Sequence, residues 1–211
     1  MGVPGTSLTT IQNEIVTLIP RCPVPYITVM LRETSVTFFR ESEVWRRELP
    51  AIDIVDGTAS YKLTPDVGTG ADIPDIWRIL TAEINDEVQD PDTYYLDLIA
   101  TSDVYDWYLV FNDDYVPDAD ITDGLVVDIA LSPAKGSGWS EPFVMHQWSR
   151  ALVFGTLTRL FSMPSRPWAN PEEARNYEDL YEREKARARD ERTQQFISNG
   201  VLKATNPEGW L

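Results

Sequence analysis

Between Arg159 and Arg192 the chain reads RLFSMPSRPWANPEEARNYEDLYEREKARARDER, and it changes from apolar to charged across two prolines and a tryptophan. Pro164 predicts the end of an apolar helix, because proline lacks the backbone N–H that a helix interior needs. The segment Asn170-Pro171-Glu172-Glu173 predicts the start of a second helix, since it combines an N-cap, a proline in the first turn and a capping glutamate. We therefore expect a rigid helical hairpin, with Trp168 as the plug between its two helices.

The first arm of this hairpin is predicted to run from Pro142 to Met163 and is apolar on nearly every side. Such a helix must be buried all round. In a chain with only a few other helices, neighbouring subunits would supply part of that cover. The predicted subunit interface consists of Trp148, Leu152, Phe154, Leu157 and Phe161.

The second arm becomes almost wholly charged beyond Tyr181, which is typical either of a solvated helix end or of a projecting arm. Apolar residues return after it, but Gly200 and Pro207 prevent a long regular helix. We interpret this segment as a tail that docks on another surface, with a frayed terminus as the alternative. The predicted docking residues are Phe196, Ile197, Val201, Leu202, Trp210 and Leu211.

Two helices are predicted before the middle of the chain. The first would be capped by Thr6 or Ser7 and would end at Pro20. The second would begin at Pro25 and end before Pro50.

From Leu49 the pattern changes to short runs rich in Ile, Val, Tyr and Trp, separated by turn residues. Asp56-Gly57 predicts a hairpin turn, and we expect about five or six antiparallel strands. The predicted fold class is α+β, a four-helix bundle from both chain ends with an inserted antiparallel β module. The predicted segments are residues 1–48 (N-terminal helices), 49–133 (acidic β-rich insertion), 139–197 (C-terminal helical hairpin) and 198–211 (docking tail).

The negative charge of the protein is concentrated in this insertion. Between Ala51 and Ala130 there are 19 Asp and Glu residues against two basic residues, Lys62 and Arg78, whereas the whole chain has a net charge of −16. Affinity for nucleic acid comes from Lys and Arg. We therefore expect a surface that repels DNA and a chain without a nucleic-acid-binding face.

The amino-acid composition does not predict a catalytic site. With His146 as its one histidine and Cys22 as its one cysteine, the chain cannot supply a Ser-His-acid triad, a two-histidine metal site or an internal disulfide. Asn112–Gly124 resembles a calcium loop, but its aspartates are misspaced and Ile129 replaces the bidentate glutamate. No catalytic, cofactor-binding or metal-binding residue is predicted, and the N-terminus and hydropathy indicate a soluble protein made in the cytoplasm.

The predicted order of elements resembles that of the head-to-tail adaptor (connector) proteins of tailed bacteriophages, especially the tail tubular protein A type. This order is two N-terminal helices, a β-rich insertion, an apolar helix, a proline-tryptophan turn and a charged helix. The residues that carry this resemblance are Gly155–Arg189, Leu49-Pro50 and the DG-x-x-x-Y-x-L piece from Asp56 to Leu63. The resemblance implies a virion protein at the head–tail junction, not an enzyme, that forms a dodecameric ring below the portal. It implies three partners besides further copies of the chain: the portal protein, a tail or nozzle protein, and DNA that passes without specific binding. No cofactor and no membrane are implied.

Two other functions remain open from the sequence. One is another virion component, a tail terminator or neck ring protein. The other is a carbohydrate-binding or hydrolytic β domain on a helical base, with Asp and Trp side chains forming its site.

Overall fold

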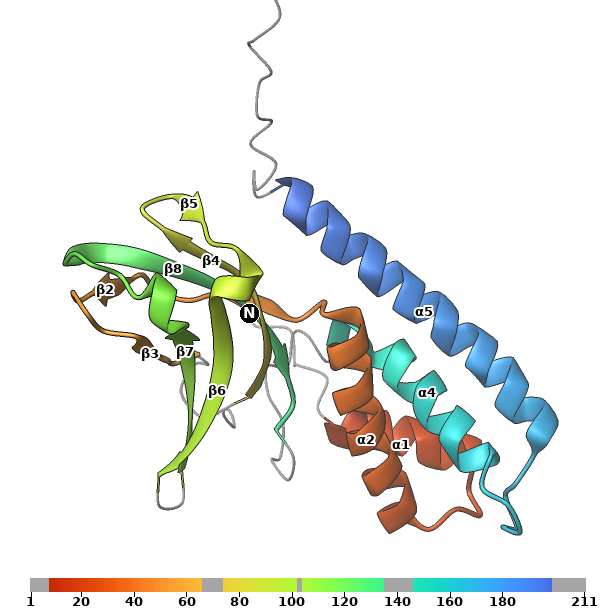
Figure 1. The fold of residues 1–211 in the computed structure, drawn as a ribbon. Helices are drawn as coiled ribbons and strands as arrows, with labels where there is room; N and C mark the ends of the chain where they lie inside the picture. Colours follow the sequence, from red (N-terminus) through yellow and green to blue (C-terminus); the bar gives the residue numbers. More distant parts are fainter. Residues whose placement is uncertain (1–7, 66–73, 102–103, 135–145, 199–211) are drawn as a thin grey trace, which may run out of the picture.

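The computed structural model describes residues 8–65, 74–101, 104–134 and 146–198, and these form an α+β fold with the helices beside two antiparallel sheets (Figure 1). The helices within the described residues are α1 (Leu8–Leu18), α2 (Val24–Ser42), α4 (Ser149–Phe161) and α5 (Pro171–Ser198). The strands are β1 (Arg46–Glu48), β2 (Ile52–Ile54), β3 (Ser60–Leu63), β4 (Asp75–Ile84), β5 (Glu87–Val88), β6 (Tyr94–Thr101), β7 (Val104–Phe111) and β8 (Ile121–Ser132). The cap expected at Thr6 or Ser7 and the helix start expected at Pro142 lie outside the described residues.

The start of α5 follows the local sequence signals. The side-chain oxygen Oδ1 of Asn170 accepts hydrogen bonds from the backbone N–H groups of Glu172 (3.2 Å) and Glu173 (3.3 Å). These donors have no partner within the helix, so the asparagine stabilises its first turn. The N-cap predicted from the sequence is confirmed.

Helix α4 lies against α2 and α5, and its centre has no room for a side chain. A Cβ atom on Gly155 would come within 2.6 Å of Thr34 Cγ2 on α2 and within 2.7 Å of Tyr181 Cε2 on α5. Glycine therefore sets how closely the three helices approach one another at this point.

The predicted four-helix bundle from both chain ends is wrong. An N-terminal pair and a C-terminal hairpin of helices lie beside the β core, and they do not align as one bundle (Figure 1). Their lengths differ greatly, from 11 residues in α1 to 28 in α5. Part of the apolar surface of α2 is covered by the β part of the chain, since Phe39 lies 5.6 Å from Trp45 beside β1. Hydrophobic periodicity predicts which face of a helix is buried, but it does not say which element covers that face.

The larger sheet is built around β8. In the described residues this strand pairs with β4 on one side and with β1 and β2 on the other, and β5 extends the sheet beyond β4. The alternate residues Leu125, Val127, Ile129 and Leu131 of β8 are fully buried. This spacing follows from the period of two in a strand, which places them on one face.

The smaller sheet has the order β3-β7-β6 and turns its apolar face into the same hydrophobic core. The expected hairpin at Asp56-Gly57 is wrong, because β2 pairs with β8 whereas β3 pairs with β7. Gly57 still makes a turn with a positive φ of 71°, but that turn carries the chain from one sheet to the other. Such a dipeptide specifies a turn, and the strands that follow it choose their partners through side-chain packing.

We predict that Gly155→Leu will lower the free energy of unfolding by about 1–3 kcal/mol or more, since a larger side chain must push α2 or α5 aside. Chemical denaturation monitored by circular dichroism measures this change. Ala186→Leu, which adds the same side chain on the exposed face of α5, is the matched control and should change stability by less than about 0.5 kcal/mol. Equal stability of the two variants would contradict the close approach at Gly155.

Candidate functional site

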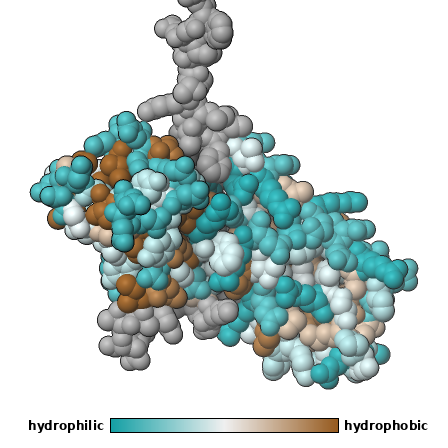
Figure 2. Space-filling view, in the orientation of Figure 1, coloured by the Kyte–Doolittle hydropathy of each residue, from teal (hydrophilic) through white to brown (hydrophobic). Residues whose placement is uncertain are grey.

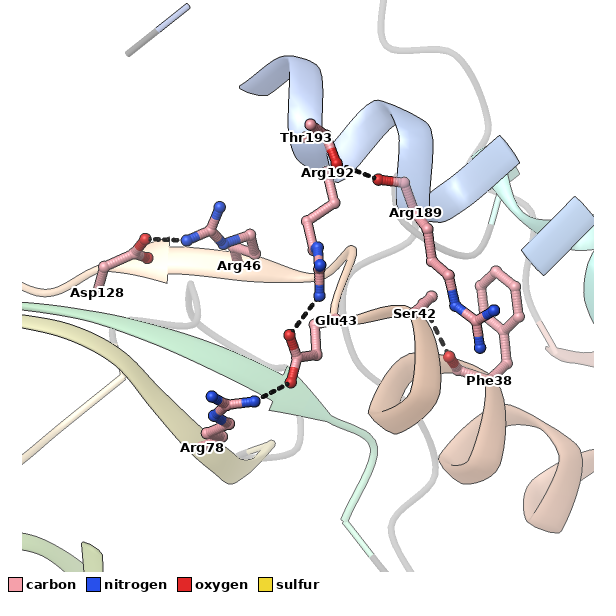
Figure 3. Close-up of polar contacts among 9 residues, drawn as sticks. All are labelled: Phe38, Ser42, Glu43, Arg46, Arg78, Asp128, Arg189, Arg192 and Thr193. Carbon is pink, nitrogen blue, oxygen red and sulfur yellow. Dashed lines mark hydrogen bonds and ion pairs between the residues drawn. The ribbon is translucent and has the colours of Figure 1, made fainter. Parts of the chain in front are cut away.

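The most highly organised polar cluster in the described residues lies where the helices meet the larger sheet (Figure 3). Helix α2 ends there at Glu43, whose backbone is left-handed (φ 49°, ψ 29°) and whose N–H donates to the carbonyl of Phe39 at 3.0 Å. The Glu43 carboxylate accepts hydrogen bonds from Arg78 Nη1 on β4 (3.1 Å) and Arg192 Nη1 on α5 (2.6 Å). We call these three residues the Glu43 junction. It connects α2, α5 and the larger sheet, and Glu43 is only 9 % exposed.

A second ion pair lies beside this junction. Arg46 Nη2 on β1 is 2.5 Å from Asp128 Oδ2 on β8, so it joins two neighbouring strands of the larger sheet. Burial lowers the pKa of Arg46, and the positive charge of Arg192 acts in the same direction, although Asp128 and Glu43 oppose it. Burial likewise raises the pKa of Asp128, against the influence of Arg46. For both groups desolvation outweighs the attraction of the partner, as expected for a buried pair whose role is to fix geometry.

Two further contacts hold the second half of α5 in place. Lys185 is buried, and its Nζ lies 2.8 Å from Glu41 Oε2 of α2 and 2.6 Å from Glu182 Oε1 of its own helix. Burial alone would lower the pKa of Lys185, but the hydrogen bonds to Glu182 and Glu41 raise it above its ordinary value. Gln147 donates a short hydrogen bond to Glu191. The charged part of α5 therefore lies along the molecule as a packed element.

The one histidine of the chain, His146, lies just before α4. His146 is exposed, and its carbonyl accepts a hydrogen bond from Ser149 Oγ at 3.1 Å. Within the described ranges, no group of three His, Cys, Asp or Glu side chains could hold a metal ion. None of the helices described here is long and apolar enough to cross a membrane. The chemistry available at the Glu43 junction is the positioning of elements by charge-assisted hydrogen bonds.

The aspartates of Asn112–Gly124 take part in turns. Asp120 Oδ1 accepts the backbone N–H of Asp56 at 2.8 Å, and the N–H of Asp123 donates to Asp53 Oδ1 at 2.8 Å. Carboxylates that accept backbone N–H groups in this way stabilise loops. These contacts connect the approach to β8 with β2 and the turn that follows β2.

The predicted interface residues on α4 and just before it divide into two sets. Trp148, Leu152 and Leu157 are buried within the chain itself, so they lie beneath the surface that a neighbouring subunit could reach. Phe154 and Phe161 are half-buried, and their rings lie 6.0 Å and 5.8 Å from that of Tyr177 on α5. Helix α5 supplies much of the cover that the sequence suggested would come from another subunit.

Trp168 lies in the turn between α4 and α5 and is 9 % exposed. Its ring is 5.7 Å from that of Tyr26 on α2, and the guanidinium of Arg166 lies over both rings. The indole N–H has no hydrogen-bond partner among the described residues. The turn is therefore attached to the start of α2 as well as to the hairpin.

The docking-tail prediction falls largely outside the described residues. Phe196 and Ile197 lie within the last turns of α5, while Val201, Leu202, Trp210 and Leu211 lie beyond the described chain. The tail stays a prediction.

Most of the large apolar residues that are exposed in the described part of the chain fall into two groups, with Val55, Val88 and Tyr115 outside them. The helical-end group flanks the turn between α1 and α2 and consists of Leu18, Val24, Tyr26 and Val29. The β group consists of Trp77 on β4 and Tyr95, Leu98 and Ile99 on β6. Figure 2 shows hydrophobic patches over the sheets, whereas α5 presents a hydrophilic surface in this view. Leu98 and Ile99 follow one another in β6, so their side chains point to opposite faces of the smaller sheet. Exposed apolar surface is typical of interaction sites where it is contiguous.

Comparison with known proteins gives no relative: no protein-family model matches the chain, and no match is found among curated proteins. Sequence reasoning also missed the Glu43 junction. Its members lie 35 and 149 residues apart in the chain, and nothing in the local pattern marks them. The one available signal was Arg78, one of only two basic residues among the acidic residues of the insertion.

We predict that Glu43→Ala will lower the free energy of unfolding by about 1–3 kcal/mol, because Arg192 loses its charged partner in a poorly hydrated place. The high exposure of the Arg78 side chain, 65 %, moderates the loss. Glu43→Gly loses the same contacts but removes the cost of a left-handed backbone, so it should be more stable than Glu43→Ala by about 1 kcal/mol. Denaturant titrations compare the two variants.

Glu33→Ala is the matched control for Glu43, since it removes an exposed ion pair with Arg159. It should cost less than about 1 kcal/mol. An alanine variant at Glu43 as stable as the one at Glu33 would contradict the structural role of the junction.

We predict that Trp168→Ala will lower the free energy of unfolding by about 3 kcal/mol or more, because removal of a large buried side chain leaves a cavity. Trp168→Phe keeps most of the packing and removes an indole N–H that lacks a partner, so its loss should be smaller. Thermal melts of the two variants provide the measurement. An unchanged melt of Trp168→Ala would mean that the turn does not depend on this side chain.

Proposed function

We propose that this chain is a head-to-tail adaptor of a tailed bacteriophage, a virion structural protein that forms a ring below the portal, joins capsid to tail and lets DNA pass. The observation that carries the proposal is the presence of two separate apolar groups on one chain, one at the helical end and one on the β part. A closed ring is built from heterologous contacts, in which each subunit presents two different surfaces to its two neighbours.

The stiffness of the connection between the two groups supports the same proposal. The Glu43 junction and the Arg46–Asp128 pair hold helices and sheet together through contacts of 2.5–3.1 Å. A ring closes only if every subunit repeats the same angle, so the surfaces must be held by a rigid body.

The charge distribution suits a conduit for DNA. The region from Ala51 to Ala130 carries 19 acidic residues and two basic ones, and Arg78, one of those two, is already bound to Glu43. DNA is repelled by such a surface and passes it without being held. In this proposal the β part contributes to the wall of the channel.

The first test is assembly of the purified full-length chain, measured by native mass spectrometry and electron microscopy with and without portal protein. We expect rings, and Leu18→Asp together with Val29→Asp should weaken assembly about tenfold or more, because charge is placed in an apolar contact. Tyr115→Asp is the control: this side chain is 55 % exposed but belongs to neither apolar group. Its rings should remain intact.

Two outcomes would count against the proposal. A chain that stays monomeric at high concentration and also with portal protein is not an adaptor. A ring that binds the far end of a tail tube but not portal would instead favour the tail terminator.

A further inference from the structure

A groove runs between the two sheets, between β4 and β6. Its volume is about 240 Å³, and its walls come from two short runs of chain. The lining residues are Trp77, Arg78, Ile79 and Leu80 from β4, Pro91 before β6, and Tyr94, Tyr95 and Leu96 from β6. Strands β4 and β6 belong to the two sheets (Figure 1), and the lining residue Arg78 connects the groove to the Glu43 junction.

The β6 wall of the groove is a free strand edge. Among the described strands β6 pairs with β7 alone, over its whole length from Tyr94 to Thr101. The carbonyl of Thr93 accepts the N–H of Asn112 at 2.9 Å, so by alternation the backbone groups of Tyr94, Leu96 and Leu98 point away from β7. The N–H of Leu98 fits this pattern, since it donates to Asp97 Oδ1 at 2.8 Å.

The β4 wall is free over its first half. Strand β5 pairs only with Glu83 and Ile84, and the N–H of Gln89 donates to the carbonyl of Ala82 at 2.8 Å. Before Ala82, β4 has no described strand on its groove side. An open strand edge is a template for another extended segment, and one beside a groove also offers space for side chains.

The negative charge of the chain around the groove favours a positively charged ligand. From the start of β4 to the end of β6 the chain carries seven acidic residues, which are Asp75, Glu83, Asp86, Glu87, Asp90, Asp92 and Asp97. The one basic residue of the lining, Arg78, donates to Glu43. Exposed aromatic side chains, Trp77 (43 %) and Tyr95 (52 %), border the same groove. The guanidinium of Arg40 already lies 4.4 Å from the centre of the Trp77 ring, and Tyr95 can cover the aliphatic stem of an incoming lysine or arginine.

We propose that this groove binds an extended, basic segment of a partner protein, which adds as a strand to the free edge of β6. Backbone hydrogen bonds to Leu96 would supply affinity, and the acidic residues would select Lys and Arg on the incoming strand. The acidic β part of a second copy of the chain is disfavoured as the ligand of this groove, because the two negative charges repel each other. All residues of the groove lie within one chain, so a monomer would contain the site. The groove shares Trp77 and Tyr95 with the β group, so a ring contact that covers these two residues would compete with the added strand.

The direct test uses the full-length chain and a short synthetic peptide of alternating lysine and valine. There are three control peptides. Two are the same peptide with N-methyl groups on one backbone edge or on the other, and the third has glutamate in place of lysine. We expect the lysine peptide to bind, one of the two methylated forms to bind about tenfold or more weakly, and the glutamate peptide to show no measurable binding. Isothermal titration at low salt measures these affinities.

The location of binding is tested by amide hydrogen exchange. The N–H of Leu96 should gain protection in the presence of the lysine peptide, because it would become part of a new strand pair. Tyr95→Ala and Trp77→Ala should each weaken binding about threefold or more, while Tyr115→Ala, an equally exposed aromatic outside the groove, should leave it unchanged.

Several results would overturn the proposal. Equal affinity of both methylated peptides and the parent excludes strand addition. Equal affinity of the glutamate and lysine peptides excludes charge selection. Protection confined to the helices places binding elsewhere. If Tyr95→Ala or Trp77→Ala fails to fold, the peptide series and the exchange data on the unaltered chain still decide the question.

Discussion

The position of the helices relative to the larger sheet depends on the hydrogen bonds that the Glu43 carboxylate accepts. It lies at the residue where α2 ends, and it receives one arginine from the larger sheet and another from the last helix. The left-handed backbone of Glu43 turns the chain from α2 toward β1. Because an ordinary L-residue adopts this conformation at a cost of about 1–2 kcal/mol, its surroundings must hold it there, and the two arginines contribute to that.

The helical part is built around a different constraint, the lack of space at Gly155. There α2, α4 and α5 approach one another so closely that a single Cβ atom would collide with two of them. Tyr177 of α5 lies beside Phe154 and Phe161 of α4, so α5 covers part of the apolar surface of α4. The surface that α5 presents in Figure 2 is hydrophilic. Most of the apolar residues left exposed in the described chain lie at the turn between α1 and α2 and on the sheets, with Val55 and Tyr115 in the connections between strands. These are the places where partners are expected, in the proposed ring as in the proposed strand addition.

The negative charge of the β part acts in the same way in both proposals. Carboxylates spread over a sheet surface repel phosphate and attract ammonium and guanidinium groups. A surface that lets DNA pass is therefore also one that favours a basic segment of protein. Free strand edges are normally protected against unwanted pairing, and Asp97 protects the edge of β6 by binding the N–H of Leu98. A positively charged strand would be attracted by this same carboxylate.

The features that the amino-acid sequence predicted correctly are local ones. The N-cap at Asn170 depends on residues within one helical turn. The strands were expected from Leu49, but β1 already begins at Arg46. The choice of partners was beyond such signals. Three predictions depended on which elements pack against each other, and the sequence does not show this. They are the four-helix bundle, the hairpin at Asp56-Gly57, and the assignment of Trp148, Leu152 and Leu157 to a subunit surface. That choice comes from contacts such as Arg192 with Glu43, 149 residues apart, and a contact of this kind forms only when the whole chain packs together.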